Sequence, residues 1–152
     1  AQKKFMEKAI SIAKKSAKGE DYAVGAIIVK DGKVLSEGKT LLNHSPDPTV
    51  HAEIVAIRKA CKKVNSRFLE GCVLYTTHEP CPMCASAAIW ARMKGIVFGA
   101  TIEDAYSYAS NKFSWRQINS KCKEVLEKGK PKLLLVGGFM REECNELFLL
   151  SR

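Results

Sequence analysis

The sequence predicts an α/β protein in which helices cover both faces of a mixed β-sheet. Segments with apolar residues at helical spacing alternate with short β-branched runs, in the order helix, strand, strand, helix, strand, helix, strand, helix, strand, helix. The first two strands are joined by a two-residue turn and the later ones by helices, which makes the sheet mixed. The chain of 152 residues has no linker or internal repeat, so a single domain spanning residues 1–152 is expected.

The N-terminal part of the chain is predicted to form a helix followed by a β-hairpin. Apolar residues recur at helical spacing through residues 2–18, which indicates an amphipathic helix. Residues 24–29 form an apolar run typical of a buried strand. Asp31 and Gly32 then predict a tight turn that leads into a second strand at residues 34–35.

The central part of the chain is predicted to contain two helices separated by a strand. Thr49 is expected to cap the first of these helices, whose apolar stripe runs from Ile54 to Cys61. Residues 73–77 are β-branched and aromatic, which is typical of a strand. The alanine-rich segment at residues 81–91 predicts the second helix.

The C-terminal part is predicted to hold two more strands and two more helices. Residues 96–98 and 133–136 are apolar and predict the strands, with a helix near residues 115–127 between them. A glycine pair after the last strand turns the chain into a final helix within residues 140–152. This last segment is a candidate for closing a substrate pocket.

Charge and composition narrow the classes of protein to which the chain can belong. Its formal net charge is +9, and basic residues gather in residues 1–18 and 112–132. Such a surface attracts nucleic acid, although the same charges also suit an ordinary solvated surface. No apolar run approaches the ~20 residues of a membrane helix, and the N-terminus lacks the apolar segment of a signal peptide. We therefore expect a cytoplasmic protein with no membrane partner.

The chain contains six cysteines, which we interpret as reduced thiols, two of them bound to metal. A chain of this size does not need disulfides for stability, and nothing in it predicts export. The remaining cysteines and two large aromatic residues lie in apolar patterns and are expected in the core: Cys61, Cys72, Cys122, Cys144, Trp90 and Phe98.

Two short motifs carry the chemistry. His51 and Glu53 form an H-x-E motif, and Cys81 and Cys84 lie in a P-C-x-x-C motif that starts at Pro80. The combination is typical of zinc-dependent nucleobase deaminases. Zinc prefers imidazole and thiolate ligands, and a catalytic site keeps a fourth position for water. We therefore predict a zinc ion held by one histidine and two cysteines.

The spacing of these residues predicts where they lie on their helices. Cys81 and Cys84 are three residues apart and share one face of a helical turn. His51 and Glu53 are two apart, so they converge only if they stand at the very start of a helix. Two helix N-termini would then point at the metal, and their positive ends would favour thiolate and hydroxide. A redox pair or half of a zinc ribbon are the alternatives for C-x-x-C alone.

Three stretches resemble the cytidine deaminase-like superfamily, in its nucleobase and tRNA-adenosine deaminase branch. They are residues 24–26, 47–53 and 79–84. The resemblance implies a three-layer α/β/α sandwich with a five-stranded mixed sheet, a zinc ion, and a homodimer or larger oligomer. It also implies substrate-binding positions, which are Val24, Thr40, Ala52 and Pro80 in this chain.

The segments that bear on the identity of the substrate resemble more than one group of deaminases. Residues 57–61 and 89–92, and the long stretch at 101–132, resemble bacterial guanine deaminases. Val24 instead resembles the tRNA-adenosine and fungal cytosine enzymes. Guanine deaminases carry an acidic pair in the late segment, whereas residues 110–113 of this chain contain no acid.

A second departure concerns a substrate-binding asparagine. Most of the branch places Asn eleven residues before the zinc-binding histidine, and this chain has Thr40 there. Asn43 lies nearby and would substitute only if the loop were rebuilt. His78 and Glu79 precede the cysteine motif. His78 is a candidate for the wall of the pocket or an ordinary loop residue, and Glu79 either supports the ligands or is a surface residue at the end of the strand.

These residues lead to a hypothesis about the reaction. Zinc lowers the pKa of bound water toward ~7, and Glu53 is expected to pass the proton of that water to the ring nitrogen. Hydroxide attacks the amino-bearing carbon, and Glu53 then delivers a further proton to the leaving amine, which departs as ammonia. The first hypothesis for the substrate is a free purine base or nucleoside, of the guanine type. The alternatives are adenosine in tRNA or another single-stranded nucleic acid, and an inactive zinc-stabilised protein that only binds nucleic acid.

Overall fold

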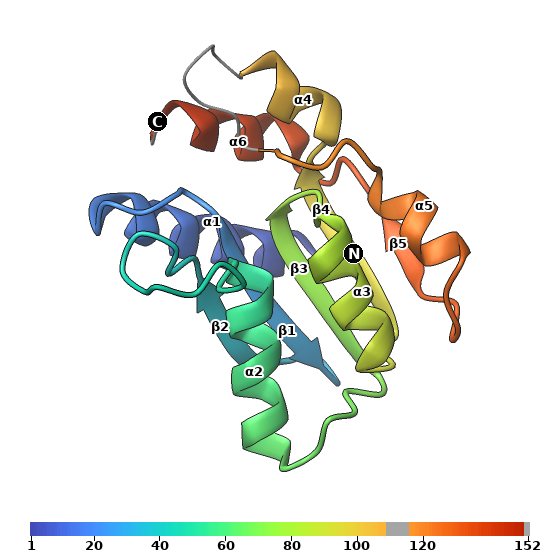
Figure 1. The fold of residues 1–152 in the computed structure, drawn as a ribbon. Coiled ribbons are helices and arrows are strands. Elements are labelled where there is room, and N and C mark those ends of the chain that lie inside the picture. Colours follow the sequence, from blue (N-terminus) through green and yellow to red (C-terminus); the bar gives the residue numbers. More distant parts are fainter. Residues whose placement is uncertain (109–115, 151–152) are drawn as a thin grey trace.

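A computed structural model describes residues 1–108 and 116–150 of the chain (Figure 1). Helices and strands alternate largely as the sequence predicts. The elements are α1 (Lys3–Lys18), β1 (Gly25–Lys30), β2 (Lys33–Lys39), α2 (Ala52–Val64), β3 (Cys72–His78), α3 (Pro82–Trp90), β4 (Gly95–Ala100), α4 (Ile102–Ser107), α5 (Cys122–Glu127), β5 (Leu134–Val136), α6 (Arg141–Asn145) and the 3-10 helix η1 (Glu146–Leu149).

The five strands form one mixed sheet in the order β2-β1-β3-β4-β5. β1 pairs antiparallel with β2 and β3, whereas β3, β4 and β5 run parallel to one another. The hairpin between β1 and β2 turns at Asp31 (φ 49°) and Gly32 (φ 74°). A two-residue hairpin turn of the favoured kind needs positive φ at both positions, which Asp-Gly supplies at little cost. The predicted mixed sheet and its hairpin are confirmed.

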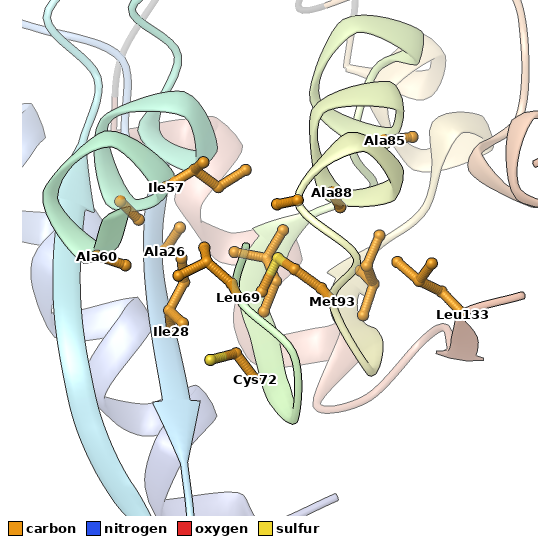
Figure 2. Packing of buried hydrophobic residues seen from close by; sticks show 14 of the residues in the cluster. Ala26, Ile28, Ile57, Ala60, Leu69, Cys72, Ala85, Ala88, Met93 and Leu133 are labelled. Atoms are coloured by element: carbon orange, nitrogen blue, oxygen red, sulfur yellow. The ribbon is translucent and has the colours of Figure 1, made fainter. Parts of the chain in front are cut away.

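Helices cover both faces of the sheet, which confirms the three-layer sandwich. On one face α2, α3 and α5 enclose a core with the sheet, and Figure 2 shows Ile57 and Ala60 of α2 packed over Ala26 and Ile28 of β1. On the other face α1, α6 and η1 enclose a second core. Within the described residues, no helix combines the length and the apolar character that a membrane crossing requires.

Both helices that follow the sequence motifs begin at the same end of the sheet. β3 ends there and leads into α3, and α2 begins there after the loop that follows β2 (Figure 1). The carboxyl ends of parallel strands are the usual place for a site in an open α/β sheet. The two motifs of the sequence therefore meet at this end of the sheet.

A glycine in β2 brings α2 close to the sheet. A Cβ at Gly38 would lie 2.2 Å from the Ala52 carbonyl oxygen and 2.6 Å from the Ala56 amide nitrogen. Both atoms belong to the backbone of α2, so only glycine allows this approach of strand and helix. The first turn of α2, which follows His51 and carries Glu53, is thereby fixed against the sheet.

Several predictions about individual residues are corrected by the structure. Trp90 is 81% exposed, so its predicted core position is wrong, whereas Phe98 is buried as expected. The reason is that α3 is apolar around its whole circumference, so its sequence does not indicate which side faces the sheet. Cys72, Cys122 and Cys144 are buried, but Cys61 is only half-buried.

The C-terminal helices are shorter than predicted. The helix expected near residues 115–127 is limited to α5, and residue 115 lies outside the described residues. The final helix is divided into α6 and the 3-10 helix η1. Met140 has a φ of 54°, which is incompatible with a right-handed helix, so α6 cannot begin before Arg141.

An ion pair joins α4 to α6. Both carboxylate oxygens of Asp104 accept hydrogen bonds from the Arg141 guanidinium, with N–O distances of 2.7 Å. The Asp104 carboxylate also completes a capping box with Thr101 at the start of α4. The pKa of Asp104 is lowered from 3.8 to about 2, first by the hydrogen bond from Arg141.

We expect Asp104→Asn to destabilise the protein at neutral pH by about 1–2 kcal/mol, because it removes a charge-assisted pair that is open to solvent on the arginine side. A lowered pKa means that the pair contributes fully above the unfolded-state pKa near 4. The contribution disappears as the pH falls through the folded-state pKa of about 2. Urea unfolding of both proteins at pH 7 and near pH 2 measures the difference. Asp31→Asn, in the hairpin turn, is the control, and an equal deficit at both pH values would contradict the prediction.

Candidate metal centre and active site

Three side chains from the two motifs converge where α2 and α3 begin. The Nδ1 atom of His51 lies 3.6 Å from Cys81 Sγ and 3.7 Å from Cys84 Sγ, and the two sulfur atoms are 3.7 Å apart. Bonds of about 2.0–2.3 Å from a tetrahedral zinc ion place its ligand atoms roughly 3.3–3.8 Å apart. The His-Cys-Cys group therefore suits zinc, and it is the group of potential metal ligands found among residues 1–108 and 116–150.

The ligands from the two motifs can meet because they stand at or near the N-terminal ends of helices. His51 is the N-cap residue of α2, and Cys81 is the N-cap residue of α3. Both have extended backbone angles, so their side chains reach past the helix ends, as the sequence predicts. Thr49 does not cap α2 as expected, because its hydroxyl donates instead to Asp47 within the preceding loop. The positive ends of two helices thus face the thiols.

The thiols of the cluster differ in how readily they ionise. The pKa of Cys81 is lowered to about 4, first by the thiol–thiol contact with Cys84 and, against the effect of burial, by its hydrogen bond with His51. The same contact and burial raise the pKa of Cys84 well above its usual value. Both thiols would bind zinc as thiolates, the form that coordinates metal.

Glu53 lies beside the ligands in the first turn of α2. It is only 4% exposed and lines the same cavity as His51 and Cys81. Burial raises the pKa of its carboxyl group, and the neighbouring charge on His51 opposes this shift. A buried carboxyl group with a raised pKa next to a metal centre has the character of a proton-transfer group.

The cluster opens into a cavity of about 370 Å³. Three of the predicted substrate-binding residues, Val24, Thr40 and Ala52, line it together with Glu53. Pro80 is fully buried and is not among the lining residues. The carbonyl oxygen of Pro80 accepts a hydrogen bond from Arg116 instead.

The loop after β2 contains Thr40, at the position of the family asparagine, and the nearby Asn43. Thr40 stands at the cavity wall, and its hydroxyl lies 3.5 Å from a carboxylate oxygen of the buried Asp21. The Asn43 side chain donates to the Glu20 carbonyl oxygen at 3.1 Å and is not among the lining residues. Asn43 therefore does not replace the family asparagine in this structure.

Aromatic rings from the C-terminal part close another side of the cavity. Phe148 of η1 lines it, consistent with the expectation for residues 140–152. Its ring meets His78 edge-on at 4.7 Å and stacks on Tyr108 at 4.8 Å, measured between ring centres. Burial lowers the pKa of His78 to about 3, so this predicted wall residue is neutral. Residues 110–113, where an acid is missing, lie outside the described residues.

Two further residues, Glu79 and Arg116, belong to this site. The sequence leaves open whether Glu79 supports the ligands or lies on the surface; in the structure it is buried, and its carboxylate accepts the amide hydrogens of Ile102 and Cys122, the first residues of α4 and α5. Arg116 belongs to the basic stretch at residues 112–132, for which the sequence predicts a solvated surface, yet it is buried and lines the cavity. No local signal separates Arg116 from its basic neighbours, because its burial depends on the folding of distant segments.

Comparison with known proteins identifies the family. The family described as cytidine and deoxycytidylate deaminase zinc-binding region matches residues 1–100. The guanine deaminase of Bacillus subtilis (strain 168) is 40% identical over 122 residues, which cover 79% of this chain and 78% of that enzyme. The tRNA-specific adenosine deaminase of Aquifex aeolicus (strain VF5) is 42% identical over 96 residues, or 63% of this chain.

The match to the Aquifex aeolicus enzyme spans 64% of its length, slightly less than two thirds. A solved structure from a study of A-to-I editing by tRNA:A34 deaminases at the wobble position of transfer RNA superposes with a TM-score of 0.79. It is 27% identical and covers 96% of this chain and 99% of the other. The fold, the zinc-binding motifs and these matches agree, and the chain belongs to the cytidine and deoxycytidylate deaminase family.

Proposed function

We propose that this protein is a zinc-dependent hydrolase that replaces the exocyclic amino group of a free purine base or nucleoside, of the guanine type, with oxygen. The observation that carries the proposal is the meeting of three ligand side chains and a buried carboxyl group at one cavity. Its volume of about 370 Å³ lies in the range of small-molecule sites. The cavity therefore suits a base or nucleoside.

The side chains have separate parts in the reaction. His51, Cys81 and Cys84 would hold zinc, which when bound supplies a water molecule that ionises near neutral pH. Glu53 would accept one proton of the attacking water and pass it to the ring nitrogen, and it would then carry the second proton, from the hydroxyl group now bonded to the ring carbon, to the amine, which leaves as ammonia. The start of α2 offers backbone N–H groups near Ala52 to orient the base.

Two observations support a small substrate of the guanine type. The similarity to the Bacillus subtilis guanine deaminase extends over 122 residues, compared with 96 for the Aquifex aeolicus enzyme. Phe148 forms part of the cavity wall, and its ring is held by stacking on Tyr108, which does not line the cavity. A planar base packs well against such rings.

Adenosine in tRNA is the second candidate substrate. The net charge of +9 favours it, because a basic surface attracts the phosphate backbone. The 42% identity to a tRNA-specific adenosine deaminase also supports it. The two candidates differ in whether binding depends on many phosphate contacts.

Ammonia release tests the two candidates directly. Guanine, adenine, cytosine, their nucleosides and unmodified tRNA are compared at low and moderate salt, with Glu53→Gln as the inactive control. We expect ammonia release from guanine or its nucleoside. The rate should change little as the salt concentration rises, because a neutral base carries no phosphate for the protein to contact. Release from tRNA alone, falling roughly a thousandfold or more between about 50 and 200 mM salt, would reject the small substrate in favour of tRNA.

The predicted homodimer and the cytoplasmic location also stay proposals. The exposed Trp90 at the end of α3 supports a contact with another subunit, because large exposed aromatic side chains are enriched at protein interfaces. The location rests on the sequence alone.

A further inference from the structure

A buried guanidinium group lies beside the metal ligands. Arg116 is 7% exposed and lines the cavity. Its Nη1 donates to the carbonyl oxygen of Glu79 at 3.0 Å, and its Nη2 donates to the carbonyl oxygens of Pro80 at 3.3 Å and Ser120 at 2.8 Å. One side chain thus holds three main-chain groups.

Two of these carbonyl groups immediately precede Cys81. The Glu79 side chain fixes the same stretch from another direction, since its carboxylate oxygens accept the amide hydrogens of Ile102 at 2.9 Å and Cys122 at 2.8 Å. The main chain that delivers Cys81 to the start of α3 is therefore clamped by Arg116 and by Glu79. Groups that hold metal ligands in place contribute strongly to metal affinity.

The charge of Arg116 also suits this position. Two thiolates and the buried carboxylates of Glu53 and Glu79 together carry two more negative charges than a zinc ion carries positive charges. Arg116 is close enough to His51 and Cys84 for its charge to act on both. A buried cation beside these groups would offset one of the two excess negative charges, which are costly in a low-dielectric environment.

We propose that Arg116 is a positioning residue of the metal centre: its guanidinium fork holds the carbonyl groups of Glu79 and Pro80 so that Cys81 enters α3 in the geometry that zinc requires. The planar fork is essential to this role, because a lysine has a single charged nitrogen and cannot reach the same carbonyl groups in fixed directions. The proposal rests on the zinc site of the proposed function, but not on the identity of the substrate.

The test compares Arg116→Lys, which keeps the charge, and Arg116→Gln, which removes it, with Arg67→Gln, which removes an exposed arginine charge outside the cavity. Zinc affinity is measured by competition with a chromophoric chelator, and ligand geometry by the absorption bands of the cobalt(II)-substituted protein. We expect both Arg116 variants to bind zinc about 10–100-fold more weakly and to alter the cobalt spectrum. Arg67→Gln should match the wild type in both measurements.

The outcomes separate positioning from other roles. Wild-type zinc affinity and an unchanged cobalt spectrum in Arg116→Lys would overturn the role of the fork. A lower melting temperature of the zinc-free variants with an unchanged cobalt spectrum would show a purely structural role and would also overturn it. If Arg116→Gln does not fold, Arg116→Lys decides. Failure of the wild type to bind zinc at all would instead refute the proposed function.

Discussion

Glu53→Gln should abolish nearly all turnover while leaving zinc bound and the fold intact. The amide cannot accept or deliver a proton, and a general acid–base group contributes roughly 10²–10⁴-fold to the rate. Gln has nearly the same shape, so the cavity and the first turn of α2 are preserved. The wild-type carboxyl group is buried, and its pKa is raised by that burial, so the neutral amide should not lower stability.

The measurements for Glu53→Gln are the ammonia-release rate on the best substrate, zinc content per chain, and the melting temperature. Glu37→Gln is the matched control, because this glutamate lies on β2 in a half-exposed ion pair with Lys8. The control should keep wild-type turnover. Substantial activity in Glu53→Gln would remove Glu53 from the chemistry, and loss of zinc would show that the residue supports the metal instead.

The local features of this fold could be predicted from the sequence because each depends on neighbouring residues. Asp31 and Gly32 define the hairpin through their own backbone preferences. The two motifs fix His51 and Cys81 at helix starts, because ligands at such spacing can converge only there. The order of helices and strands in turn gives a mixed sheet between two helical layers.

The features that escaped prediction depend on contacts between distant segments. Arg116 is buried only because α4 and α5 fold against Glu79, and nothing in its local sequence distinguishes it from an exposed cation. Trp90 stands on a helix whose apolar faces are equivalent in sequence, so its exposure follows from the packing of α3 alone. The Asn43 side chain bonds to the loop after α1, a partner 23 positions away.

The substrate is the least determined part of the site for the same reason. Cavity walls are contributed by Val24 before β1, Thr40 after β2 and Phe148 near the C-terminus, so their joint shape is a property of the whole fold. The metal ligands, by contrast, follow from two short motifs. The reaction can therefore be predicted from a few residues, whereas the residues that determine substrate specificity are spread over the chain.

Cys84→Ala should remove zinc and lower stability together. The Cys84 side chain is fully buried and is one of three side chains in the ligand group found within the described residues, so its removal leaves two. Zinc at a free concentration of 1,000 times its dissociation constant stabilises the folded state by about 4 kcal/mol, and the variant should lose most of this. Its unfolding should then match that of chelator-treated wild type.

Zinc content and thermal unfolding of Cys84→Ala are measured with and without chelator, beside Cys61→Ala as the control. Cys61 is half-buried on α2 and outside the ligand group, so its variant should keep zinc and respond to chelator as the wild type does. The chelator should have no effect on Cys84→Ala, because there is no bound metal to remove. If that variant retained zinc and still responded to chelator, Cys84 would not be a ligand. Loss of zinc with wild-type stability would mean that the metal serves only the chemistry and that the helix starts hold their geometry without it.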